Sequence, residues 1–128
     1  MKVTLFTSNN LRHKYLIKLI STYCDELLVV QESKSFIKKK DTNYQNSKII
    51  EKYFAKVLEA QEKTFNKEFE TNDGKNIKTL SVSEGELNKL SISFLKDYLE
   101  SDIYIVFGSS YIKGDLVDFL IRKKALNI

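Results

Sequence analysis

The sequence predicts an α/β fold: a Rossmann-like, doubly wound sheet whose strands are mainly parallel. Short apolar runs alternate with helix-length amphipathic segments along all 128 residues, and this alternation is typical of βαβ units. Residues 103–107 form such a run and lead through a loop of small residues into a helix. Sheets of this class present ligand sites at the carboxyl ends of their strands in this way. We therefore expect one domain spanning residues 1–128.

A βαβ unit is predicted at the start of the chain. Residues 2–6 are rich in Val, Leu and Phe, which suits a central strand covered on both faces. Residues 7–10 offer several helix N-caps. Apolar residues then recur at helical spacing, namely Leu11, Tyr15, Leu16, Leu19 and Ile20. Residues 26–31 read as a second strand, which we expect to pair in parallel with the first through a right-handed crossover.

The remaining segments continue the alternation. Residues 32–46 are polar and predict a loop, whereas residues 47–69 predict a long amphipathic helix with one apolar face. That face carries Ile50, Phe54, Val57, Phe65 and Phe69. A turn at residues 72–74 precedes a short third strand at residues 77–80.

A further helix is predicted from Ser83, since Glu86 follows it at capping-box spacing. Its apolar residues would be Leu87, Leu90, Phe94, Leu95 and Tyr98. The strand at residues 103–107, a helix at residues 116–120 and a last strand at residues 125–128 complete the order β-α-β-α-β-α-β-α-β.

Composition narrows the class of protein. The net charge of +4 comes from 21 basic against 17 acidic residues, an excess that a solvated surface explains without a nucleic-acid partner. No apolar run is long enough to cross a bilayer, and the first residues do not form a signal peptide, so no membrane partner is expected. Cys24 is the only cysteine, which excludes an internal disulfide and a cysteine metal cluster and favours a cytoplasmic setting. We expect no metal.

The only histidine is a candidate for chemistry. His13 follows Arg12 at the start of the first helix, where unsatisfied amides and the helix dipole favour an anion such as phosphate or carboxylate. Ser8 and Asn9 precede them at the end of the first strand. Exposed polar residues on a first helical turn explain the same pattern without a ligand. A Ser-His-Asp triad is not supported, because the G-x-S-x-G motif is absent.

The loop at residues 108–114 is neither a phosphate-binding loop nor a dinucleotide fingerprint, because its glycine spacing matches neither motif. Gly108 permits a positive φ or a close approach of the backbone to a flat ligand, and Ser109 and Ser110 can cap the next helix. A plain turn between a strand and a helix accounts for the loop equally well. By composition alone, Asn127 is an ordinary solvated residue.

Taken in order, residues 106–114, 116–120 and 125–128 resemble the amino-terminal domain of the formyltransferases that use 10-formyltetrahydrofolate. This family acts on methionyl-tRNA, glycinamide ribonucleotide and amino sugars. Its last strand in this region ends in an Asn-x-His motif, and Leu126-Asn127-Ile128 is similar up to the residue before that histidine. The opening, residues 5–10 with Arg12 and His13, resembles formyltransferase-like proteins of bacterial sugar pathways. The specific matches lie at the two ends of the chain.

The resemblance implies roles for residues at both ends of the chain. Asn127 would be a catalytic amide donor to the oxyanion that forms during formyl transfer. The folate would be bound by the loop that follows the fourth strand, through the residues Phe107, Gly108, Ser109, Ser110, Tyr111 and Ile112. The acceptor would be a small-molecule amine, and a nucleotide-linked amino sugar is preferred over methionyl-tRNA. Methionyl-tRNA is the only nucleic acid that the resemblance implies as a partner. Ser8, Asn9, Arg12 and His13 would bind the acceptor substrate.

The chain departs from the family pattern where the sequence ends. The histidine after Ile128 and the later aspartate are absent, so the resemblance implies an incomplete formyltransferase domain. His13 lies at the opposite end of the chain and does not replace the missing histidine. We therefore expect these 128 residues alone not to transfer formyl groups at a useful rate.

Two other classes of function remain open. A non-catalytic α/β ligand-binding or signalling module similar to flavodoxin-like receivers would carry acidic residues at the end of the first strand, where this chain has Thr7-Ser8-Asn9. A nucleic-acid binder would interleave aromatic and basic residues on one surface. Tyr44, Tyr53 and Phe54 lie near lysines, but helical spacing is expected to turn most of these rings inward.

Overall fold

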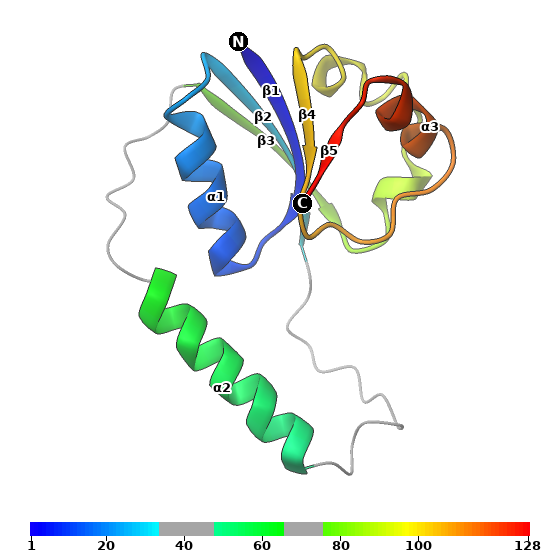
Figure 1. Ribbon diagram of the computed structural model, residues 1–128. Helices are drawn as coiled ribbons and strands as arrows, with labels where there is room; N and C mark the ends of the chain where they lie inside the picture. The colour runs from blue at the N-terminus through cyan, green and yellow to red at the C-terminus, as the bar shows by residue number, and fades with distance from the viewer. Residues whose placement is uncertain (34–47, 66–75) are drawn as a thin grey trace.

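A five-stranded parallel sheet forms the centre of the protein (Figure 1). The computed structural model describes residues 1–33, 48–65 and 76–128. The strands are β1 (Lys2–Ser8), β2 (Glu26–Ser33), β3 (Ile77–Ser83), β4 (Ile103–Val106) and β5 (Leu126–Asn127), in the order β3-β2-β1-β4-β5. All four pairings are parallel, which confirms the predicted fold class.

β1 is the central strand because it pairs with β2 on one side and with β4 on the other. Its residues from Val3 to Ser8 are all buried, as expected for a strand covered on both faces. The register places Ser8 opposite Glu32 and Phe6 opposite Val106, so three strands end at the same edge. From β1 the chain first adds β2 and β3 on one side and then adds β4 and β5 on the other side. In open α/β sheets, ligands usually bind in the crevice at the point where the strand order reverses in this way.

Helices cover both faces of the sheet, as a doubly wound fold requires. On one face, α1 (Leu11–Ser21) packs Leu16, Ile17 and Ile20 against the strand residues Val3, Leu5, Leu27 and Val29. On the other face lie α3 (Asp115–Arg122) and the segment between β3 and β4 (Figure 1).

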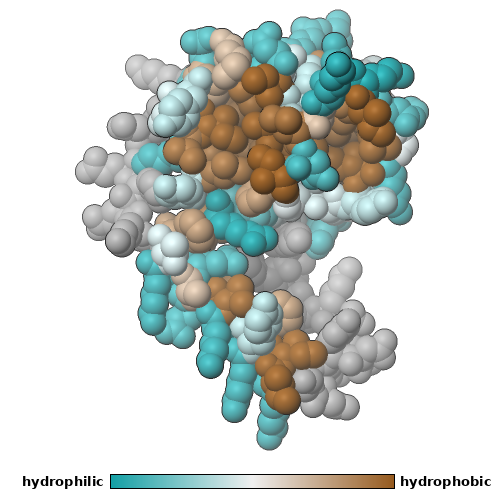
Figure 2. Space-filling model, in the orientation of Figure 1, coloured by the Kyte–Doolittle hydropathy of each residue, from teal (hydrophilic) through white to brown (hydrophobic). Residues whose placement is uncertain are grey.

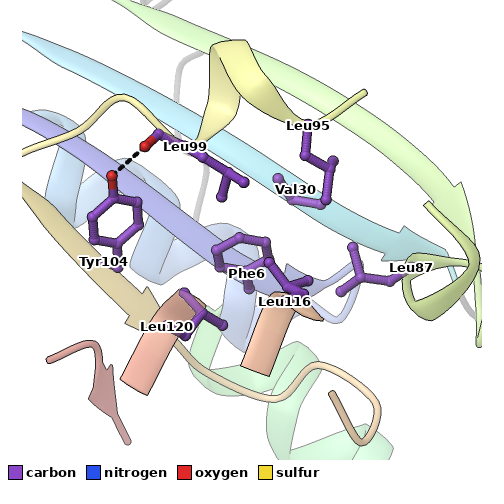
Figure 3. Packing of buried hydrophobic residues seen from close by; sticks show 8 residues of the cluster. All are labelled: Phe6, Val30, Leu87, Leu95, Leu99, Tyr104, Leu116 and Leu120. Atoms are coloured by element: carbon purple, nitrogen blue, oxygen red, sulfur yellow. Dashed lines mark hydrogen bonds between the residues drawn. The ribbon is translucent and has the colours of Figure 1, made fainter. Parts of the chain in front are cut away.

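The larger core lies on the α3 side of the sheet and is drawn in Figure 3. It joins Phe6 and Val30 from the sheet to residues of α3 and of the segment before β4, and its eight buried members are Phe6, Val30, Leu87, Leu95, Leu99, Tyr104, Leu116 and Leu120. The Tyr104 hydroxyl donates to the carbonyl of Leu99, and it accepts a 3.0 Å bond from the backbone N–H of Ser101. The one polar group that Tyr104 brings into this core is therefore satisfied.

The prediction of a helix that begins at Ser83 is wrong. Ser83 ends β3, and two single 3₁₀ turns follow, η1 (Leu87–Lys89) and η2 (Lys96–Tyr98). The backbone leaves the helical region at Leu90, where ψ is 135°. The Ser91 hydroxyl then accepts a bond from the N–H of Phe94, a local contact that competes with helix formation.

The second predicted helix is confirmed over its described residues and lies apart from the core; residues 47 and 66–69 of the prediction lie outside the described residues. α2 (Lys48–Phe65) buries none of its residues, and Phe69 lies outside the described residues, as does Tyr44. Tyr53 and Phe54 are more than half exposed, so the expectation that these rings turn inward is wrong. The Phe65 ring meets the Tyr15 ring of α1 at 5.6 Å, and Figure 2 shows apolar side chains along α2 away from the sheet. In the described ranges, no helix is long and apolar enough to cross a membrane.

Candidate functional site

The candidate site lies at the carboxyl edge of the sheet, where β4 passes into the loop at residues 107–114. Gly108 has a φ of +68° and Gly114 a φ of +66°, a region that glycine enters without steric cost. The loop is thereby turned back across the strand ends before α3 begins at Asp115. Loop, helix and β5 then enclose a space beside β4.

This space is a cavity of about 450 Å³, within the range of small-molecule sites. Its walls are mostly apolar side chains from β4, the loop, α3 and the segment leading to β5. The lining residues are Val106, Gly108, Ser109, Ser110, Tyr111, Ile112, Val117, Leu120, Ile121, Ala125 and Asn127. An apolar cavity with a few polar groups suits a flat, mostly apolar ligand with polar edges.

Asn127, whose side chain ends in an amide, is one of the residues that line this cavity. It pairs in register with Val106 of β4, and the N–H of the next residue, Ile128, donates to the carbonyl of Val106 at 3.0 Å. The backbone on both sides of the amide is therefore held by the sheet. A donor carried on a strand is more precisely placed than one on a free loop.

His13 lies beside the cavity wall and is almost completely buried. Its ring meets the Phe107 ring edge-on at 4.8 Å and lies against the backbone of Gly108. Its Nδ1 is 2.6 Å from the Ser8 hydroxyl, and the Arg12 Nε lies 3.0 Å from its Nε2. The first helix is thus tied to the ends of both β1 and β4.

The partners of the ring decide where its proton lies. A guanidinium has donors only, so Nε2 accepts from Arg12 and the proton of the neutral ring is on Nδ1. Nδ1 then donates to the Ser8 oxygen, and the Ser8 hydroxyl keeps its own proton for another acceptor. Arg12 remains exposed to solvent, with its Cζ 5.9 Å from the centre of the Phe107 ring.

Most of the residues predicted to bind folate come together around the cavity. Five of the six, from Gly108 to Ile112, line it along with Asn127, whereas Phe107 points to the His13 side. Of the residues predicted to bind the acceptor, Ser8 and His13 are buried, Asn9 is half-buried and Arg12 is exposed. The two sets, from opposite ends of the sequence, meet where His13 contacts Gly108.

Two side chains that sequence reasoning missed hold the loop in place. Glu32, at the end of β2, is fully buried and accepts bonds from Ser110. Asn88, in η1, bonds to the backbone of Tyr111 and Lys113. Neither belongs to a recognisable motif. The one signal in the sequence is the position of Glu32 directly after an apolar strand, where a carboxylate at a sheet edge is worth testing as a ligand or loop anchor.

Several shifted pKa values lie at the opposite edge of the sheet. A hydrogen bond from Lys78 and the charge of Lys2 lower the pKa of Glu26, and the same contact raises the pKa of Lys78. Partial burial raises the pKa of the Cys24 thiol, which disfavours the reactive thiolate. Within residues 1–33, 48–65 and 76–128, no group of three or more potential ligands is arranged to hold a metal ion.

Comparisons with protein-family models, with curated proteins and with solved structures found no match to this chain.

Proposed function

We propose that the chain is the folate-side portion of a formyltransferase, which moves a formyl group from 10-formyltetrahydrofolate to an amine acceptor. One observation carries the proposal: Asn127 and the loop residues from Gly108 to Ile112 line the same cavity. The resemblance in sequence assigns these two stretches to one site, although they are separated by α3. Their convergence on a single cavity supports that assignment.

The cavity fits the flat ring system of a folate. Val106, Ile112 and Leu120 offer apolar surface from three different elements, and the backbone of Gly108 carries no side chain that would narrow the space. The hydroxyl of Ser109 donates to the carbonyl of Ser110, so that polar contact is internal to the loop. The ring edges would be read by main-chain groups and by the amide of Asn127.

Formyl transfer forms a C–N bond to the acceptor amine and breaks the C–N bond to N10 of the folate, with a proton moved from the amine to N10. The amide N–H of Asn127 would donate to the formyl oxygen as that oxygen gains negative charge. A fixed donor of this kind is worth about 10² to 10³ in rate. Because β4 pairs with the strand that carries Asn127, the backbone that bears this donor is fixed before the ligand arrives.

Proton transfer needs a base beside Asn127, and His13 is not placed to supply it. It is the only histidine in the sequence, and its two ring nitrogens are engaged with Ser8 and Arg12. The ring lies behind Gly108, outside the cavity lining. This arrangement supports a structural role for His13 and little turnover by these 128 residues.

The acceptor would approach from the first turn of α1, on the other side of the Gly108 backbone. Arg12 is exposed there, with its guanidinium steadied by His13 and by the Phe107 ring. A planar cation held in this way suits a phosphate oxygen. This favours a nucleotide-linked amino sugar as the acceptor.

Binding of 5-formyltetrahydrofolate, a stable isomer of the co-substrate, tests the proposal by calorimetry. Ile121→Asp places a charge on the cavity wall at a residue that is 69% exposed, so the fold should survive. We expect about tenfold weaker binding. Phe94→Asp is the matched control, because Phe94 is 62% exposed and does not line the cavity. The two variants should differ, and equal affinity in both would contradict the assignment of the cavity.

A single-turnover assay with 10-formyltetrahydrofolate and a panel of amines tests the second part of the proposal. Little product is expected, and robust product from this chain would contradict the role given to His13. Failure of the wild-type protein to bind the folate would leave the non-catalytic ligand-binding module as the better account. That alternative has support of its own, since a buried histidine and a carboxylate-anchored loop are also features of a binding site without chemistry.

A further inference from the structure

Glu32 is a fully buried acidic residue in a chain whose other described carboxylates are half-buried or exposed. It lies near the end of β2, in register with Ser8 of β1 and with Val82 of β3. A buried carboxylate is costly unless donors surround it. Its presence at the edge that carries the cavity therefore calls for a specific partner.

Three donors meet this carboxylate, and none of them comes from a basic residue. The backbone N–H of Ser110 donates to Oε1 at 2.7 Å, and the Ser110 hydroxyl donates to Oε2 at 2.7 Å. The N–H of Gly85 donates to Oε2 at 2.9 Å. The oxygens of a carboxylate accept hydrogen bonds, and all three partners of Glu32 are donors, so donors and acceptors match. A glutamine would turn an NH₂ group toward one of these donors and lose the match.

The donors belong to two loops that are far apart in the sequence. Ser110 lies 78 residues after Glu32 and lines the cavity, while Gly85 lies in the turn after β3. Asn88 acts on the next part of the same loop, since its amide donates to the Tyr111 carbonyl at 2.7 Å and its oxygen accepts from the Lys113 N–H at 2.8 Å. The wall of the cavity is thus bonded to side chains outside it.

We propose that Glu32 is the positioning residue of this cavity: by holding Ser110 from both its amide and its hydroxyl, it sets the shape of the wall that the ligand meets. The folate as ligand rests on the proposed function, whereas the anchoring of the loop does not. In this arrangement the backbone N–H of Ser110 is hydrogen-bonded to Glu32, so it is not available to bind the ligand. The ligand would therefore be recognised by the polar groups of the loop on either side of Ser110 and by Asn127.

Glu32→Gln tests the inference, with Glu86→Gln as the matched control. Glu86 undergoes the same chemical change in the adjacent turn, but its side chain is 47% exposed and bonds to Lys89 at the surface. Amide hydrogen exchange is measured for residues 109–113 and, as an internal reference, for β1. We expect loop amides to exchange at least about tenfold faster in Glu32→Gln than in Glu86→Gln, with β1 protection retained.

The second readout is the affinity for 5-formyltetrahydrofolate, taken at a temperature where every variant is fully folded. A residue that only adds global stability would leave this affinity unchanged, whereas a positioning residue weakens it, here by about tenfold. Unchanged loop exchange together with unchanged affinity in folded Glu32→Gln would overturn the inference.

Ser110→Ala keeps the test decisive if Glu32→Gln does not fold. This variant removes the hydroxyl bond and keeps the amide bond, so we expect a smaller effect in the same direction, about threefold in loop exchange. Loop exchange equal to wild type would then overturn the inference. If wild-type protein does not bind the folate at all, the proposed function fails, and the exchange measurement still decides the role of Glu32.

Discussion

The imidazole ring of His13 lies directly against the backbone of Gly108, with no room between them for a side chain. A Cβ atom at position 108 would come 2.3 Å from Cε1 of the ring and 2.6 Å from Nε2. The contact joins the first helix to the loop that lines the cavity. It also requires a glycine, because the φ of +68° disfavours any other residue.

Gly108→Ala should therefore be strongly destabilising, since backbone strain and a steric clash act together. We expect a loss of at least about 3 kcal/mol in the free energy of unfolding, measured by urea denaturation. Gly114→Ala separates the two causes, because Gly114 has a φ of +66° and a Cβ atom there would meet nothing within 4 Å. It should lose only about 1 to 2 kcal/mol. Equal losses at the two positions would mean that the His13 contact is unimportant.

Ser8 and Thr7 are adjacent, fully buried hydroxyl residues with opposite predicted effects. Ser8 accepts the Nδ1 proton of His13, so Ser8→Ala leaves a buried donor unpaired and should cost about 1 to 3 kcal/mol. Thr7 Oγ1 is the one buried side-chain oxygen or nitrogen without a partner in the described part of the chain. Thr7→Val, which removes that oxygen at constant shape, should leave stability unchanged or raise it. Thermal unfolding of the two variants gives the comparison.

Leu95 and Phe94 test the packing of the segment between β3 and β4. Leu95 is fully buried in the core of Figure 3, whereas its neighbour Phe94 is 62% exposed. Leu95→Ala should cost about 2 to 5 kcal/mol because it opens a cavity, and Phe94→Ala should stay within about 0.5 kcal/mol. Chemical denaturation measures both. A larger loss of stability in Phe94→Ala than in Leu95→Ala would mean that this segment packs through its other face.

The ion pair at the opposite edge of the sheet predicts a dependence of stability on pH. Lys78 Nζ lies 2.8 Å from Glu26 Oε1, and this contact lowers the pKa of Glu26 in the folded state below its ordinary value of 4.5. The stabilisation is therefore present above about pH 4.5 and is lost as the pH falls through the lower folded value. Glu26→Gln should be less stable than wild type near neutral pH, with a difference that shrinks in acid.

The difference in stability between wild type and Glu26→Gln is measured from their melting temperatures between about pH 7 and about pH 3. Because both partners are partly exposed to solvent, about 1 M salt should reduce the difference at neutral pH as well. A constant gap between the two proteins at every pH would contradict the assignment to Glu26.

Sequence reasoning succeeded where the signal is local. Val, Leu and Phe in residues 2–6 and the apolar run at residues 103–107 predict buried strands, and both strands are found with parallel pairing. It failed between Ser83 and Tyr98, where leucines at helical spacing pack from two separate turns instead of one helix. Periodicity reports that these residues are apolar at certain intervals, but Ser91 and the extended Leu90 break the backbone between them.

The candidate site divides in the same way. Asn127 and the loop from Gly108 to Ile112 could be proposed together from the sequence because they lie close together in the chain and resemble a known pattern; they line one cavity, and their roles stay a prediction. Glu32 and the contact of His13 with Gly108 were missed because each depends on the register of the sheet, which brings together residues 78 and 95 positions apart. No local pattern carries that information.

The place of β1 in the sheet has a consequence for how the chain folds. β1 is made first, yet one of its two neighbours is β4, and the backbone N–H of Lys2 bonds to the side chain of Asp102, 100 residues later. Pairings of such long sequence separation slow folding, because a large loop must close before they form. During synthesis on a ribosome, β1 and β2 can pair early, but one flank of β1 stays open until β4 emerges. The nascent chain would therefore expose the strand that later lies at its centre, and this interval is when a chaperone would be most needed.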